Sequence, residues 1–360
     1  MQALVQGRSA QVVVVTGASA GVGRAIVHRF ARAGWRIGLI ARDAAALDEV
    51  RREVEEMGGT ALVAPADVAD AQAVFAAAEQ IASAFGAIDV WINDAMVTVF
   101  SPFWDMTPDE FHRVTEVTYL GFVHGTMAAL RHMRPVDRGA IIQIGSALAY
   151  RGIPLQSAYC GAKHAIRGFT NALRTELLHE GSNVRLTMVE LPAVNTPQFD
   201  WARTHMPKQP RPVAPVVQPE VIAQTVFEAV QRPPREVWIG LSTLKVILGN
   251  MLLPAFLDRY LARFVVGAQE TTQPVSPERA DNLVSPVTAL HRTRGRFGSE
   301  AQDSAIVVSG PMFRVLPVLI GGAALLAIGF AAGTGSTRTG VSTARLPRRH
   351  AGSRRRMAIT

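Results

Sequence analysis

Seven short apolar runs, separated by segments with helical spacing, set the strongest limit on how this chain of 360 residues folds. The runs are rich in Val and Ile and are apolar on both alternations, as strands covered on both faces are. The intervening segment AAALDEVRREVEEMG has Leu47, Val50, Val54 and Met57 at helical intervals. The pattern predicts an α/β fold, a doubly wound parallel sheet of seven strands with helices on both faces. The runs are QVVVVTG, RIGLIAR, TALVAPAD, IDVWINDA, GAIIQIGS, VRLTMVEL and EVWIG.

The pattern changes after Gly240, so residues 1–240 are predicted as one nucleotide-binding and catalytic domain. Residues 241–266 are strongly apolar but contain Lys245, Gly249 and Pro254, which indicates an apolar helical extension of one or two helices. Residues 267–310 are polar and contain three prolines, which is typical of a linker.

A hydrophobic helix is predicted over residues 311–333, followed by a basic disordered tail over residues 334–360. Its central 18 residues, 315–332, carry no charge and reach roughly 27 Å as a helix, enough to span a bilayer. A buried core helix is the alternative, but the preceding polar segment favours membrane association. The positive-inside rule would keep the arginine tail in the cytoplasm and send the first domain across the membrane, so the orientation stays open.

The charge distribution argues against nucleic-acid binding, although the net charge is +8. Residues 301–360 hold eight arginines and one acidic residue, which leaves 29 basic against 28 acidic residues in the remainder. A nucleic-acid-binding domain normally carries a basic face on its folded body. The single cysteine and the lack of a signal-like N-terminal segment predict a cytoplasmic catalytic domain.

A glycine-rich turn follows the first apolar run, in the sequence TGASAGVGRA. A strand, such a turn and a helix bring backbone amides and the positive end of the helix dipole to a pyrophosphate. An ordinary tight turn is the alternative interpretation. The TGxxxGxG spacing resembles that of the classical short-chain dehydrogenase/reductase family, a Rossmann-like fold. The residues expected to bind the cofactor here are Thr16, Gly17, Ser19, Gly21, Val22 and Gly23.

The resemblance covers residues 10–240 and implies further nucleotide contacts at the ends of later strands. An NAD-preferring member usually has an acidic residue at the tip of the second strand, and this chain has none there but has Arg42 next to it. The guanidinium of Arg42 suits a 2'-phosphate, so NADP(H) is expected over NAD(H). A solvated surface arginine is the alternative. The other matching positions are Asp67 and Val68 at the adenine, Asn93 and Ala95 in the segment NDAM, where the family has NNAG, and Pro192 and Thr196 at the nicotinamide.

Tyr159 and Lys163 lie one helical turn apart in SAYCGAKHAIRGF, so their side chains share one helix face. A tyrosine has an ordinary pKa of about 10, and a nearby ammonium lowers it, which suits proton transfer. The resemblance adds Ser146, thirteen residues before Tyr159, as the hydrogen-bond donor to the substrate oxygen. Tyr159 and Lys163 are also expected to bind the cofactor, because the compact ammonium of Lys163 can reach a ribose hydroxyl. The plain alternatives are a loop cap for Ser146, a core ring for Tyr159 and a solvated charge for Lys163.

Thr118 occupies the position of the asparagine with which the family holds a water in a proton relay to the lysine. A threonine is shorter and has no amide, so this catalytic position departs from the family. The histidines show no metal-ligand spacing, and no metal site is expected.

The prediction is an NADPH-preferring oxidoreductase that moves hydride between nicotinamide and a carbonyl or secondary alcohol of a lipophilic small molecule. Phe199, Trp201 and Met206 fall where the family has its substrate loop and suggest an apolar pocket wall. The family implies a homodimer or homotetramer. Two alternatives stay open: an epimerase or dehydratase that uses the same Tyr–Lys pair, and a catalytically weak nucleotide-binding membrane scaffold or redox sensor.

Overall fold

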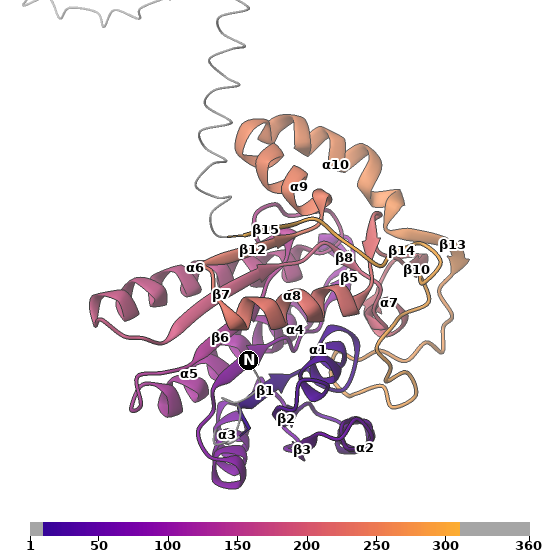
Figure 1. The fold of residues 1–360 in the computed structure, drawn as a ribbon. Helices are drawn as coiled ribbons and strands as arrows, with labels where there is room; N and C mark the ends of the chain where they lie inside the picture. The colour runs from indigo at the N-terminus through magenta and orange to yellow at the C-terminus, as the bar shows by residue number, and fades with distance from the viewer. Residues whose placement is uncertain (1–9, 310–360) are drawn as a thin grey trace, which may run out of the picture. The chain divides into compact units, whose positions relative to one another are not determined.

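A computed structural model describes residues 10–309 and shows a central eight-stranded sheet in the order β15-β12-β7-β6-β4-β1-β2-β3 (Figure 1). The seven predicted strands are present and pair in parallel. An eighth strand, which the sequence pattern did not predict, pairs antiparallel with β12 at one edge. The strands are β1 (Val12–Thr16), β2 (Arg36–Ile40), β3 (Thr60–Val63), β4 (Val90–Asn93), β6 (Ala140–Ile144), β7 (Arg185–Glu190), β12 (Glu236–Ile239) and β15 (Val307–Ser309).

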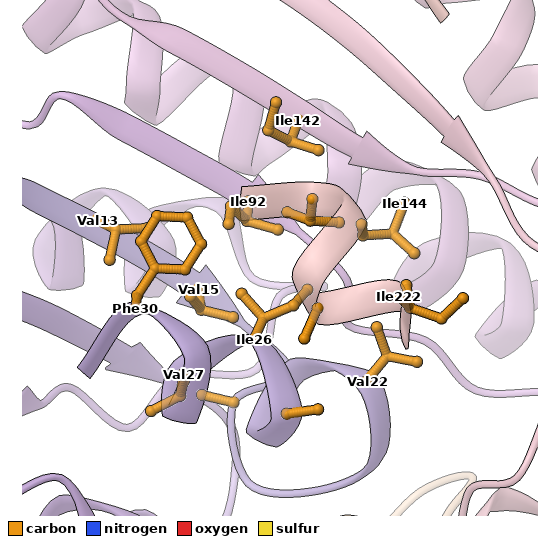
Figure 2. Close-up of a cluster of buried hydrophobic side chains, with 14 of the residues drawn as sticks. Val13, Val15, Val22, Ile26, Val27, Phe30, Ile92, Ile142, Ile144 and Ile222 are labelled. Atoms are coloured by element: carbon orange, nitrogen blue, oxygen red, sulfur yellow. The ribbon is translucent and has the colours of Figure 1, made fainter. Parts of the chain in front are cut away.

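Helices cover both faces of the sheet, because strand residues alternate between the two faces and both sets are apolar. Val13 and Val15 face one side, where they pack on α1, α2 and α8, whereas Val12 and Val14 face α3, α5 and α6. Figure 2 shows the first of these clusters. The helices are α1 (Gly21–Ala31), α2 (Ala44–Glu56), α3 (Ala71–Phe85), α4 (Pro108–Thr115), α5 (Gly121–Met133), α6 (Ser157–His179) and α8 (Pro219–Gln231).

The chain reverses its direction of winding at β1, from which β2 and β3 lie on one side and β4, β6 and β7 on the other. Ligands of open parallel sheets bind at this switch point, outside the carboxyl ends of the strands. Short elements surround that edge: β5 (Val99–Phe100), η1 (Phe103–Asp105), η2 (Glu116–Leu120), η3 (Ala147–Ala149), β8 (Ala193–Val194), α7 (Gln198–Trp201), β9 (Arg203–Thr204), β10 (Lys208–Pro210) and β11 (Val216–Val217).

The region after β12 begins with two helices, α9 (Leu241–Leu252) and α10 (Pro254–Ala268), followed by β13 (Glu270–Pro274) and β14 (Ala301–Gln302). We call residues 275–300, between these two strands, the strap. Leu283 of the strap is buried in the core with Val68, and the ring of Phe297 contacts that of Phe199 at 6.0 Å. The described part of the segment predicted as a linker therefore packs on the domain.

Two regions lie outside the described residues, namely 1–9 and 310–360. The predicted hydrophobic helix over 311–333, its uncharged span 315–332 and the basic tail over 334–360 all fall there. Among residues 10–309, no helix is both long enough and apolar enough to cross a membrane.

Candidate active site

A cavity of about 730 Å³ opens at the carboxyl ends of the strands, where the sheet changes its direction of winding. Its walls come from the glycine-rich turn, the ends of β2, β4 and β6, one face of α6 and the loop after β7. Helices α9 and α10 and the strap complete them. Residues predicted to bind a nucleotide and residues predicted to carry out proton transfer thus line one cavity.

The glycine-rich turn leaves no space for side chains at two of its glycines. A Cβ at Gly23 would lie 2.2 Å from the carbonyl oxygen of Gly17, and one at Gly17, where φ is +73°, would lie 2.9 Å from Cα of Ala95. Ser19, Gly21 and Val22 line the cavity. The two glycines therefore let the turn pack on itself and on the loop after β4, which fixes its shape beside the cavity.

Thr16 acts within the protein and does not line the cavity. Its hydroxyl oxygen accepts hydrogen bonds from the backbone N–H groups of Asp94, at 3.1 Å, and Ala95, at 3.3 Å. The predicted cofactor residue thus fixes the loop after β4 against the end of β1.

Asn93 is likewise fully buried and holds elements together. Its carboxamide oxygen accepts a hydrogen bond from Nε1 of Trp91 at 2.8 Å, and its Nδ2 donates to Oε1 of Gln143 at 2.9 Å. Nδ2 also lies 3.2 Å from Oγ1 of Thr126. The cavity wall at this loop comes from residues 94–97, not from the Asn93 side chain.

Arg42 lines the cavity at the tip of β2, but the strap already accepts two of its hydrogen bonds. Nη1 donates to the carbonyl oxygen of Val284 at 2.7 Å and Nη2 to that of Asn282 at 2.6 Å. Asp67, which also lines the cavity together with Val68, forms an ion pair with Arg113. The sequence predicted Arg42 as a free partner for phosphate and did not predict these strap contacts.

The strap also reaches the glycine-rich turn. The backbone N–H of Gly21 donates to the carbonyl oxygen of Arg292 at 3.0 Å, and Nη1 of Arg24 donates to that of His291 at 2.8 Å. His291 lines the cavity, with Nε2 3.2 Å from a carboxylate oxygen of Asp43. Residues of the strap thus belong to the site, although sequence reasoning did not identify them.

Ser146, Tyr159 and Lys163 converge on the opposite wall, the serine just after β6 and the other two on α6. Nζ of Lys163 donates to the carbonyl oxygen of Ile144 at 2.7 Å and lies 5.5 Å from the ring centre of Tyr159. The three residue types that the resemblance groups together are therefore neighbours in the cavity.

Burial dominates the electrostatics at this wall. It raises the pKa of the Tyr159 phenol above its ordinary value, although a hydrogen bond with Ser146 acts in the opposite direction. It also lowers the pKa of Lys163 to about 8, against the attraction of Asp94 and Glu190. The sequence predicted a lowered pKa for Tyr159, and that prediction differs from the structure because burial raises the pKa and the negative charges of Asp94 and Glu190 raise it further.

Two carboxyl groups interact with Lys163 at this wall. Asp94 is half-buried and lines the cavity, whereas Glu190 is fully buried behind it. Burial raises the pKa of Asp94 to about 7, against the effect of the Lys163 ammonium. Glu190, the last residue of β7, accepts a hydrogen bond from the backbone N–H of Ser146 at 2.6 Å. Sequence reasoning missed Glu190; the signal was a charged residue at the end of the apolar run VRLTMVEL.

Thr118 does not reach the cavity, so the predicted relay position is not part of this wall. Its hydroxyl donates to the carbonyl oxygen of Val97 at 2.7 Å and accepts from the N–H of Val97 at 3.0 Å. The side chain is fully buried and satisfied by these two bonds.

The remaining predicted residues lie at the loop after β7. Pro192 and Thr196 line the cavity, as do Phe199 and Trp201, whereas Met206 packs behind them on Phe199. Within residues 10–309, no cluster of His, Cys, Asp and Glu could hold a metal ion. Helices α9 and α10 add an apolar wall of Val246, Phe256, Leu257, Tyr260, Leu261 and Val265.

Comparison with known proteins agrees with this geometry. The short chain dehydrogenase family model matches residues 11–206. An uncharacterised oxidoreductase of Bacillus subtilis, YxnA, is 32% identical over 284 residues, which cover 78% of this chain and 80% of that protein.

Two solved structures are also similar. An alcohol dehydrogenase from the archaeon Thermococcus sibiricus, complexed with 5-hydroxy-NADP, gives a TM-score of 0.55 at 27% identity and covers 63% of this chain and 95% of its own. A metagenomic short-chain oxidoreductase in complex with NADP gives 0.52 at 30% identity and covers 62% and 90%. The chain therefore belongs to the short-chain dehydrogenase family and is an NAD(P)-dependent oxidoreductase of that family.

Proposed function

We propose that the protein is an NADPH-preferring oxidoreductase that interconverts a carbonyl and a secondary alcohol on a lipophilic small molecule. The observation that carries this proposal is the placement of Ser146, Tyr159 and Lys163 in the cavity that the glycine-rich turn also lines. The similar structures in complex with NADP and 5-hydroxy-NADP support the choice of cofactor.

The residues of the cavity fit a dinucleotide. Gly17, Ser19, Gly21 and Val22 of the turn line the cavity, and α1 starts at Gly21 with the positive end of its dipole on that side, which suits a pyrophosphate. On the strap, Oδ1 of Asn282 is buried without a hydrogen-bond partner among the described residues, although it belongs to a cavity-lining side chain. Arg42 supplies a cation for a 2'-phosphate.

When bound, the nicotinamide supplies or accepts the hydride. The hydroxyl of Ser146 orients the substrate oxygen and donates a hydrogen bond to it. Tyr159, whose raised pKa keeps it neutral, donates its phenol proton to that oxygen during reduction and takes the proton back during oxidation. Lys163 supplies a positive charge that stabilises the phenolate left behind. Thr196 and Pro192 hold the nicotinamide side of the cavity.

The lipophilic character of the substrate follows from the wall that α9 and α10 contribute. Leu257, Leu261 and Val265 line the cavity, together with the rings of Phe256 and Tyr260. Phe256 is 60% exposed and Tyr260 is 47% exposed, so these rings connect the cavity with the surface. An apolar substrate is stabilised by about 25 cal/mol for each Å² that it buries there.

The proposal is tested by NADPH oxidation over aliphatic aldehydes and ketones of increasing chain length, with the wild type and Tyr159→Phe. The variant loses the transferable proton, so kcat/KM is expected to fall by about 100-fold to 10,000-fold. Tyr119→Phe is the matched control, because Tyr119 packs on Phe169 outside the cavity. Nucleotide binding without Tyr159-dependent turnover would contradict the proposal and support the cofactor-binding scaffold or redox sensor.

A further inference from the structure

Glu190 is a fully buried acid behind the catalytic wall to which the proposed mechanism gives no role. Its Oε2 accepts the N–H of Ser146 at 2.6 Å, and no N–H or O–H group of the described residues donates to its Oε1. The contact with the end of β6 is close, because a Cβ at Gly145 would lie 2.3 Å from Oε2. Burial of an ionised carboxylate costs far more free energy than burial of the neutral acid, and the Glu236 carboxyl group is a hydrogen-bond partner for a proton on Glu190.

A second carboxyl group, that of Glu236 on β12, interacts with Glu190. Strand β12 pairs with β7 so that Trp238 lies opposite Glu190, which puts Glu236 on the same face of the sheet two residues away. Oε1 of Glu236 accepts hydrogen bonds from Nε1 of Trp238, at 3.0 Å, and from the hydroxyl of Tyr150. A proton on Glu190 therefore removes the repulsion between the two carboxylates.

Charged and titratable groups face Glu190 from three directions. Burial and the Glu236 carboxylate raise its pKa well above the ordinary value, whereas the Ser146 N–H and Lys163 act in the opposite direction. The ionised form of Glu190 would raise the pKa values of Tyr159 on α6 and of Tyr150 after η3. Burial and the Glu236 carboxylate thus favour the protonated form of Glu190, and its charge is coupled to that of Lys163.

The proton that Tyr159 gives to the substrate has to be replaced, and Thr118 is bonded to Val97 and unavailable for that task. We propose that Glu190, sharing a proton with Glu236, is the proton reservoir behind Lys163. This inference rests on the proposed function. Glu190 is a positioning residue in the sense that it acts through Lys163 and Ser146.

The transfers balance over one reduction. Tyr159 loses a proton to the substrate oxygen and regains one from the Lys163 ammonium, and the neutral amine then takes the proton from Glu190, directly or through one water. The resulting Glu190 carboxylate keeps the Ser146 N–H as a donor and faces the restored ammonium. A proton from solvent returns along Glu236, whose partner Tyr150 is half-buried.

Glu190→Gln tests the reservoir, since the amide keeps an oxygen for the Ser146 N–H but cannot release a proton. The wild type without nucleotide is expected to show the infrared carbonyl band of a protonated carboxylic acid at pH 7, and the variant to lack it. With substrate, the kcat of Glu190→Gln is expected to be about tenfold lower than that of the wild type. Its kcat is expected to fall at a lower pH on the alkaline side of the pH profile. The Kd for NADPH is expected to stay within about twofold of the wild-type value. Glu110→Gln is the matched control, because Glu110 is buried but its partners Thr107 and His205 lower its pKa.

Glu236→Gln provides a second variant. Removing its charge lowers the pKa of Glu190, so the infrared band is expected to disappear at a lower pH than in the wild type. A band that persists in Glu190→Gln, or a pH profile that coincides with the wild type, would overturn the inference. Absence of turnover in the wild type would instead overturn the proposed function, while the infrared band would still report on the proton of Glu190.

Discussion

The two ends of the cavity differ in how their charged side chains are stabilised. At the catalytic end, which comprises Ser146, Tyr159, Lys163, Asp94 and Glu190, burial moves the pKa of Lys163 to about 8 and that of Asp94 to about 7. At the other end, called the adenosine end after the proposed function, Arg42 and Asp67 line the cavity and Arg24 is buried behind the glycine-rich turn. Each of these charges has a hydrogen-bonded or ionic partner. Under the proposed function, the first end moves protons and the second holds the nucleotide in place.

The strap accounts for much of this difference. It gives backbone carbonyl oxygens to Arg24 and Arg42, and it reaches the N–H of Gly21, the residue with which α1 begins. At the catalytic end the enclosing residues come from β4, β6, β7 and α6 instead. Variants at the two ends should therefore separate turnover from nucleotide affinity.

Lys163→Met should give the largest effect, because it removes the buried cation that stabilises the phenolate of Tyr159. We expect kcat to fall by about 1,000-fold while the Kd for NADPH changes far less. Single-turnover absorbance of NADPH measures the first quantity and fluorescence titration the second. Lys208→Met, at an exposed lysine of β10, is the control. Retention of more than about a tenth of the activity would break the assignment of chemistry to this end.

Leu283→Ala tests the attachment of the strap to the adenosine end. Leu283 is 1% exposed, so the cavity left by its truncation should lower the free energy of unfolding by about 2 to 5 kcal/mol. Val284, the next residue, is 63% exposed, and Val284→Ala should stay within about 0.5 kcal/mol of the wild type. Denaturant unfolding measures both, and equal effects would show that the strap is not anchored by Leu283.

Arg42→Ala distinguishes two roles of that arginine. A charge-assisted contact to a 2'-phosphate predicts a Kd for NADPH about tenfold higher, with the Kd for NADH nearly unchanged. The titration is repeated with Arg51→Ala, an arginine of α2 that pairs with Asp48 and Glu55 away from the cavity. Equal weakening of both nucleotides would mean that Arg42 acts through the strap carbonyls alone.

Asp94→Asn is expected to have the smallest effect of these variants, and it tests the raised pKa of the Asp94 carboxyl group. The Asp94 carboxyl group has the ordinary pKa of 3.8 in the unfolded chain and a pKa of about 7 in the folded protein. Between those values the folded state binds more protons, so the free energy of unfolding falls as the pH rises. At pH 8 the variant should melt about 3 °C higher, and the difference should vanish near pH 4. Asp48→Asn, at an exposed aspartate, should show no such trend. A constant difference across this range would contradict the buried proton.

Much of the site was predictable because its signals are local. The strand runs, the turn from Thr16 to Gly23 and the spacing of Ser146, Tyr159 and Lys163 each depend on neighbours in sequence. The structure brings most of these residues to one cavity, although their roles rest on the proposal above. Thr16, Asn93 and Thr118 are exceptions, because buried partners satisfy their side chains away from the cavity, and Gly23 does not line the cavity either.

The strap and Glu190 could not be predicted in the same way. The strap binds Arg42 and Gly21 through backbone carbonyl oxygens, which leave no signature in residue type, and its buried apolar residues, such as Leu283 and Phe297, are isolated in a polar segment. The sequence alone does not indicate whether a glutamate at the end of an apolar run is exposed or buried. Only the approach of β6 and β12 encloses Glu190.

The central claim is that this cavity transfers hydride with the help of Tyr159. NADPH that carries deuterium at both C4 positions tests it most directly, with a ketone from the panel and mass spectrometry of the alcohol. The account predicts one deuterium per product molecule with the wild type and a product yield reduced at least about 100-fold with Tyr159→Phe. Unlabelled product, or equal labelling and yield with both proteins, would contradict it.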